Sequence, residues 1–221
     1  SKKIPVLVLM GGADIHPSLY GEKIKGAVDP ILQRDKVELS LIRTYINGEK
    51  GFLTGFCRGH QFAAVAQGLT LIQDIPRDPR FKDGVKHTYS AEMANDQGNR
   101  NAYHDIKISR DSLLFEATGK EVIRVNSRHH QAVEGQSNNG QVKIVGHEGP
   151  HKMVEALEFN NGRGYTFQFH PEDMKTVESR KILETVIKRA QETFQYDQKV
   201  SKGKLTRIPT FLCKKGFSSF F

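Results

Sequence analysis

The sequence lacks long apolar runs and has few cysteines. Among its 221 residues no apolar stretch approaches the ~20 residues of a membrane span, so no membrane segment is expected. The apolar stretch at residues 4–10 is too short for a signal sequence and runs into a loop, which favours a buried strand. The two cysteines, Cys57 and Cys213, lie far apart in different surroundings. This argues against a disulfide framework and favours a reducing, cytoplasmic location.

Repeats and low-complexity tracts are also absent, and the length suits one α/β domain with a tail. We divide the chain into a domain over residues 1–195 and a basic, aromatic extension over 196–221. The net charge of +8 is compatible with an acidic partner, but it indicates nothing about the chemistry. The tail is expected to be a solvated extension, or alternatively a docking segment for a protein or polyanion. We expect no nucleic-acid partner.

Apolar periodicity predicts an α/β fold. Residues 4–10 and 51–56 are continuous apolar runs, which are typical of strands in a parallel sheet. Helical spacing over 35–47, 62–67 and 178–194 predicts helices between and after the strands. Further strands are expected over 104–108, 122–125, 141–146, 153–159 and 164–169, and several of them alternate as antiparallel strands do. Residues 76–101 form a polar excursion that could cover the site as a lid.

One cysteine lies on a strand-to-helix turn. Cys57 has Gly55 two residues before it and Gly59 two residues after it, between an expected strand and an expected helix. Small neighbours let such a turn close, and the helix N-terminus that follows favours a thiolate and offers N–H groups to an oxyanion. This turn, called the elbow below, has the G-x-nucleophile-x-G pattern and predicts a nucleophilic cysteine.

A reactive cysteine needs a base, and the base needs a group that orients it. His170 and Glu172 follow an expected strand and can share one face, because strand side chains alternate with a period of two. Glu172 would fix the tautomer of the imidazole, and His170 would exchange a proton with Cys57 and a leaving amine. The alternative is an ordinary surface or core histidine.

A second polar group follows the strand expected over 122–125. Its side chains suit recognition of an amide or an amino-acid head group: Arg128, His129, His130 and Gln131. The adjacent histidines His129 and His130 are a poor metal site, because the side chains of neighbouring residues on a strand or loop point in different directions. The pattern His147-Glu148-x-x-His151 resembles a zinc-protease motif, but Gly149 and Pro150 would break the helix that it requires. We therefore expect neither a metal nor another cofactor.

Several motifs together resemble a known family. They are Gly55-Phe56-Cys57-Arg58-Gly59-His60-Gln61, Phe169-His170-Pro171-Glu172, the Gly11-Gly12 segment that continues to Glu22, Gln73-Asp74-Ile75, and Asn126 to Val133. The chain resembles the class I glutamine amidotransferase superfamily, and within it the branch of γ-glutamyl-γ-aminobutyrate hydrolases, the C26 type of cysteine peptidase. The resemblance covers residues from about Val6 to about Ala190.

The resemblance implies a flavodoxin-like three-layer fold with a mainly parallel central sheet. It implies a catalytic triad of Cys57, His170 and Glu172, and an oxyanion hole formed by N–H groups of Gly11, Gly12 and Arg58. It also places Gln61 and the loop from Arg128 to Gln131 beside a glutamyl group. The substrate would be a small γ-glutamyl amide or glutamine.

Two departures from the family pattern stand out. Family members carry a strand–helix unit before the Gly-Gly loop, whereas only ten residues precede Gly11 here, so we expect either a truncated chain or a reduced version of the fold. The tail is the second departure. The sheet edge exposed by the missing unit, or the tail, could dock a protein partner.

Three functions remain open at this point. The first is a free-standing hydrolase that cleaves a γ-glutamyl amide through a thioester on Cys57. The second is a glutaminase component that supplies ammonia to a separate synthetase. The third is a non-enzymatic assembly protein that keeps the fold, against which the complete Cys57, His170 and Glu172 set argues.

Overall fold

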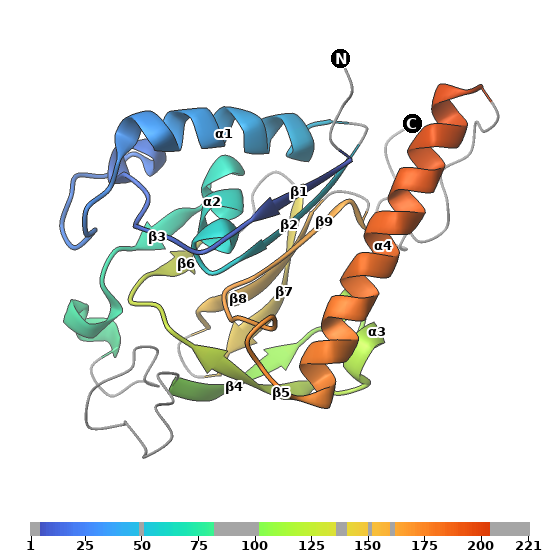
Figure 1. Cartoon of the computed structure of the whole chain (residues 1–221). Coiled ribbons are helices and arrows are strands. Elements are labelled where there is room, and N and C mark those ends of the chain that lie inside the picture. The colour runs from blue at the N-terminus through green and yellow to red at the C-terminus, as the bar shows by residue number, and fades with distance from the viewer. Residues whose placement is uncertain are drawn as a thin grey trace.

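The computed structural model describes residues 5–48, 51–81, 102–135, 141–149, 152–159 and 162–203. Strands and helices alternate in the first third of the chain, and strands dominate the second half (Figure 1). The strands are β1 (Val6–Leu9), β2 (Phe52–Phe56), β3 (Thr70–Ile72), β4 (Ala102–Ile108), β5 (Val122–Ser127), β6 (Ala132–Glu134), β7 (Val142–Glu148), β8 (Val154–Phe159) and β9 (Gly164–Phe167). The α-helices are α1 (Leu32–Ile46), α2 (Arg58–Ala66), α3 (Leu113–Thr118) and α4 (Val177–Ser201), and the 3₁₀ helices are η1 (Pro17–Tyr20), η2 (Ile75–Arg77) and η3 (Pro79–Phe81).

The nine strands in the described part of the chain belong to one sheet. Its main path runs β1-β2-β9-β8-β7-β4-β5, and β3 and β6 pair beside it, with β6 also bonded to β8. The pairs β1–β2 and β2–β9 are parallel, and the remaining pairs are antiparallel. The expected α/β class is confirmed. The parallel arrangement occupies the part of the sheet that carries the elbow, and the alternating strands of the second half are antiparallel, as their pattern indicated.

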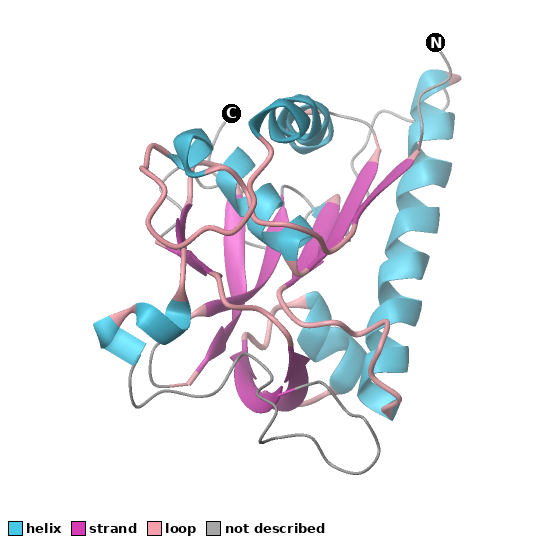
Figure 2. Cartoon of the chain, turned by 60° about the vertical axis from the view of Figure 1, so that its left-hand side comes forward, coloured by secondary structure: helices cyan, strands magenta, loops and turns pink. Residues whose placement is uncertain are grey.

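Helices cover both faces of this sheet (Figures 1 and 2). One core cluster joins α1 and α2 to the sheet, with Ile42 and Phe62 fully buried in it. The other joins α3 and α4 to the opposite face, where Leu114 and Ile182 pack against aromatic side chains of β2 and β9. The expected three-layer architecture follows from these two apolar interfaces, because each helix buries one stripe against the sheet.

Two glycines let α2 lie against the parallel strands. A Cβ atom added to Gly55 would lie 3.0 Å from the backbone carbon of Gly59, and one added to Gly59 would lie 2.6 Å from the Cβ of Leu9. Any larger residue would push the helix away from β1 and β2. The glycines around Cys57 are therefore required by close packing of the turn, as the sequence pattern indicated.

The helices differ from the expected ones in three places. α1 begins three residues earlier than expected, after Ile31, whose side chain makes no capping hydrogen bond. α2 begins at Arg58, directly after the cysteine, and includes Gly59. α3 was not expected, although Ser112 caps its start and Gly119 ends it in a left-handed conformation. The two end signals are ordinary ones, but the helix is only six residues long.

The ends of the domain are partly described. α4 continues to Ser201, across the boundary expected at residue 195, and residues 204–221 of the extension lie outside the described part. Residues 82–101 of the expected lid lie outside it too, as does Cys213.

β1 forms one edge of the main strand path, and Val8 on it is 48% exposed. In the described part of the chain, no helix combines the length and apolar character needed to cross a membrane.

Replacement of Gly59 by alanine tests the packing of the elbow. The new Cβ would meet Leu9, so we expect Gly59→Ala to lose about 1–3 kcal/mol of unfolding free energy, as overpacked cores do. Urea unfolding measures the loss as a lower midpoint at unchanged slope. Gly149→Ala is the control, because no described atom lies within 4 Å of its added Cβ. Equal midpoints for the two variants would contradict the packing argument.

Candidate active site

Cys57 lies between β2 and α2 with a strained backbone. Its φ of 52° and ψ of −113° are unusual for a residue other than glycine. Hydrogen bonds hold it in place. Its N–H donates to the carbonyl of Phe167 over 2.9 Å, and its carbonyl accepts from the N–H groups of His60 and Gln61 over 3.0 and 3.1 Å. The neighbouring strand and the first turn of α2 thus hold the side chain at the carboxyl end of the parallel strands.

His170 and Glu172 lie beside Cys57, at the end of the neighbouring strand β9. The Nδ1 atom of His170 is 2.7 Å from a carboxylate oxygen of Glu172, so Nδ1–H donates and the other nitrogen stays available. His170 is buried, whereas the Glu172 side chain is 32% exposed. A Cβ added to Gly11 would lie 3.7 Å from the Cε1 of His170 and 3.9 Å from the Cβ of Cys57. The structure therefore brings the predicted nucleophile, base and orienting carboxylate together, with Gly11 next to them.

Opposing effects set the pKa of His170. Burial alone lowers it, but the hydrogen bonds and negative charges of Cys57 and Glu172 outweigh burial and raise the pKa from 6.5 to about 9. The imidazole consequently holds its proton through the neutral pH range. A protonated histidine beside a cysteine stabilises the thiolate and can later give its proton to a leaving group.

Asn126 fixes the backbone of His170 from both sides. Its side-chain oxygen accepts from the His170 N–H over 2.9 Å, and its side-chain nitrogen donates to the His170 carbonyl over 3.2 Å. Asn126 is fully buried at the end of β5. Sequence reasoning placed this residue in the recognition loop, whereas the structure shows it positioning His170. No local pattern indicated the role, because the two residues are 44 positions apart.

The side chain of Arg58 points away from solvent into a cluster of acidic groups. Its guanidinium donates to Asp35 over 2.7 Å and to Glu38 over 2.5 Å, both on α1. It also lies over the ring of Phe62, with its central carbon 4.9 Å from the ring centre. Only the backbone N–H of Arg58 is thus at the elbow, where the first N–H groups of a helix have no partner within the helix.

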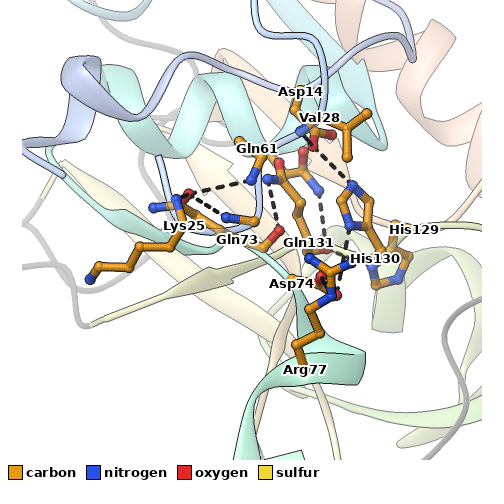
Figure 3. Close-up of polar contacts among 12 residues, drawn as sticks. Asp14, Lys25, Val28, Gln61, Gln73, Asp74, Arg77, His129, His130 and Gln131 are labelled. Atoms are coloured by element: carbon orange, nitrogen blue, oxygen red, sulfur yellow. Dashed lines mark hydrogen bonds and ion pairs between the residues drawn. The ribbon is translucent and has the colours of Figure 1, made fainter. Parts of the chain in front are cut away.

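Two of the predicted recognition residues, Gln61 and Gln131, belong to a buried amide network (Figure 3). The Gln61 side chain donates to the Gln131 carbonyl and to Gln168, each over 3.1 Å. The side chain of Gln131 donates in turn to the carbonyl of Gln73, over 3.1 Å. Gln61 and Gln131 are both buried. This chain of amides links α2 to the loops after β3 and β5, and so gives the wall beside the elbow a defined shape.

The three remaining recognition residues point in different directions. His130 bonds to Asp14 over 2.9 Å, and this hydrogen bond is the main cause of its raised pKa. His129 is buried and lies 2.7 Å from the Gln131 carbonyl. Arg128 is exposed and pairs with Asp173 over 2.6 Å. The loop is thus brought to the site, but its side chains are largely engaged with the protein.

A pocket of about 340 Å³ lies near this network, beside β3, η2 and η3. Glu22, Gln73 and Asp74 line it on one side. Its basic side chains are paired with acidic ones, as in the contact between Arg77 and Asp74 at 3.1 Å. None of the described residues that line it is one of the predicted site residues.

The zinc-protease pattern does not occur on a helix. His147 and Glu148 are the last two residues of strand β7, which continues two residues beyond the strand expected over 141–146. Adjacent strand residues point to opposite faces, so the two side chains do not act together.

The α/β fold with a cysteine elbow after β2 agrees with the family match and the relatives, which place the chain in the class I glutamine amidotransferase-like superfamily. Within it, the chain belongs to the Peptidase C26 family, whose match covers residues 2–172. It is 33% identical to the glutamine amidotransferase-like protein YvdE of Lactococcus lactis over 169 residues, which are 75% of this chain and 65% of that protein. It is 31% identical to protein NtpR of Enterococcus hirae over 171 residues, 77% of this chain and 67% of that one.

The chain therefore spans about two thirds of the length of these relatives. Among solved structures, a GMP synthase-like protein of Thermoplasma acidophilum aligns with a TM-score of 0.59. The alignment covers 89% of this chain and 78% of that one at 17% sequence identity, so the likeness is one of fold.

Titration of His170 tests the contact with Cys57. We expect an NMR pKa of about 9 in the wild type, and a lower value in Cys57→Ala, because burial remains while one partner is lost. The raised pKa also stabilises the fold: this contribution is complete below pH 6.5, and it disappears as the pH rises through about 9. The His170→Gln spectrum assigns the resonance. An unchanged pKa in Cys57→Ala would contradict the contact.

Proposed function

We propose that this protein is a cysteine hydrolase that cleaves a γ-glutamyl amide bond through a γ-glutamyl thioester on Cys57. The observation that carries the proposal is the junction of Cys57, His170 and Glu172, with the pKa of His170 raised to about 9 by the other two. Membership in the Peptidase C26 family supports a hydrolase or amidotransferase type of chemistry.

In the first step the Cys57 thiolate attacks the carbonyl carbon of the γ-glutamyl amide. The oxygen becomes an oxyanion, which the backbone N–H groups of Gly12 and Arg58 stabilise. The imidazolium of His170 gives its Nε2 proton to the amine nitrogen, the C–N bond breaks, and a free amine leaves. The γ-glutamyl group remains on Sγ as a thioester.

In the second step water replaces the amine. His170, now neutral, takes a proton from the water as the water oxygen attacks the thioester carbonyl. The C–S bond breaks, glutamate leaves, and the thiolate–imidazolium pair is restored. Glu172 keeps Nδ1 protonated throughout, so Nε2 is the nitrogen that exchanges protons.

A substrate panel separates this activity from its rivals. Glutamate release is followed with glutamine and with a series of γ-glutamyl amides that differ in the leaving amine. Turnover of the amides by the protein alone supports the hydrolase. Weak glutaminase activity that rises with a synthetase partner supports an ammonia-supplying component. No turnover, with Cys57 alkylated no faster than a model thiol, contradicts both and leaves an assembly role.

Cys57→Ala should abolish glutamate release, because the proposed thioester forms on the Cys57 sulfur. We expect a loss of at least about a thousandfold in kcat, as for other covalent nucleophiles. Cys213→Ala is the matched control and should keep wild-type activity. A glutamine-analogue electrophile should modify Cys57 alone, which peptide mapping by mass spectrometry detects. Labelling confined to Cys213 would contradict the assignment.

Glu172→Gln tests the orienting carboxylate. The amide cannot stabilise the imidazolium by charge, and it can favour the wrong tautomer, so kcat should fall by at least about tenfold. KM should change little, because Glu172 contacts the histidine rather than the substrate in this scheme. Steady-state kinetics on the best amide of the panel measures both constants. A rise in KM at constant kcat would contradict the orienting role.

A further inference from the structure

We infer that Asp35 is a positioning residue that assembles the oxyanion hole by holding both of its halves with one buried carboxylate. Asp35 lies in the first turn of α1, and only 1% of its surface is exposed. One oxygen accepts from the Arg58 guanidinium over 2.7 Å, and the other accepts from the backbone N–H of His16 over 2.7 Å. The inference deepens the proposed function and rests on it for the identity of the hole.

The two contacts reach the two segments that supply the oxyanion donors. Arg58 is the first residue of α2 and carries one donor N–H. His16 belongs to the loop that begins at Gly11 and Gly12. That loop carries the other proposed donor, the backbone N–H of Gly12. Because one carboxylate binds both segments, their distance from each other depends on Asp35 and not on the sheet alone.

A direct contact between the two halves strengthens this link. A Cβ added to Gly12 would lie 3.3 Å from the Cδ of Arg58, so the arginine side chain packs directly under the Gly12 backbone. Glu38 contacts the guanidinium from the outside, through its other nitrogen, and Arg34 pairs with Glu38 over 2.7 Å. Asp35 therefore fixes the direction of the Arg58 side chain. It also fixes the position of the Gly12 loop that packs against that side chain.

An amide cannot replace this carboxylate. An ionised carboxylate accepts hydrogen bonds on both oxygens, whereas an asparagine side chain accepts on one and donates on the other. In Asp35→Asn, either Arg58 or the His16 N–H must face an NH₂ group. The loop and the elbow should then shift apart, with little change in size or shape at residue 35.

The chain offers a matched control at the other end of β2. The carboxylate of Asp197 also bridges an arginine and a backbone N–H: Arg163 at 2.9 Å and Gly51 at 2.8 Å. Its side chain is 13% exposed. Gly51 precedes β2 and Cys57 follows it, so Asp197→Asn makes the same chemical change far from the elbow.

The experiment compares two reactions of Cys57. Acylation by p-nitrophenyl acetate passes through a tetrahedral oxyanion, whereas alkylation by iodoacetamide does not. Both rates are measured on Cys213→Ala protein, with and without Asp35→Asn or Asp197→Asn, together with thermal unfolding. Neither reagent contains a γ-glutamyl group, so the readout does not depend on the physiological substrate.

We expect Asp35→Asn to slow acylation by about tenfold to a hundredfold, somewhat less than loss of a whole oxyanion donor, while alkylation changes by less than about threefold. Asp197→Asn should lower stability and leave both rates unchanged. If Asp35→Asn does not fold, Arg58→Lys replaces it, because lysine cannot bridge the same groups, and the same selective loss is expected.

Equal effects on acylation and alkylation in a folded variant, or no effect on either, would overturn the inference. Wild-type acylation no faster than that of free cysteine would overturn it too, because no oxyanion hole would then be formed. A selective loss in a protein that turns over no γ-glutamyl amide would reject the proposed function and keep the positioning role.

Discussion

The strained backbone at Cys57 is the constraint on which the rest of the site depends. A positive φ at a residue other than glycine costs on the order of 1–3 kcal/mol, so surrounding contacts must hold it. Its N–H is bound to Phe167 and its carbonyl to the first turn of α2. This turn places the thiol at the carboxyl end of the parallel strands, where the side chain of His170, just after β9, reaches it.

Buried acidic groups transmit this constraint to the neighbouring elements. Asp35 connects α1 to the elbow and to the loop after β1, while Asp197 connects α4 to the start of β2. A buried ion pair contributes little net stability, because desolvation offsets the attraction. Its contribution is to geometry, because each carboxylate accepts hydrogen bonds from two donors and so fixes their positions relative to each other. In our proposal the bridge near Cys57 serves the chemistry, whereas the bridge at the far end of β2 is expected to serve folding.

The α/β class, the elbow and the pairing of His170 with Glu172 were readable from the sequence, because each depends on residues close together in the chain. Continuous apolar runs, glycines two residues on either side of Cys57, and a spacing of two between base and carboxylate carry that information. The start of α1, the strand β6 and the helix α3 were missed. The first has no side-chain cap, and the others are too short for periodicity to be distinctive.

By itself, then, the sequence determined which residues can do chemistry and at which ends of strands they lie, since side-chain type and local periodicity are local properties. Only the tertiary structure decided what supports them. Asn126 clamps a histidine 44 positions away, and Asp35 bridges segments on both sides of it along the chain. Such contacts depend on strand order and helix packing, which no local pattern records. The cysteine turn was a local feature, and the site around it is a property of the whole sheet.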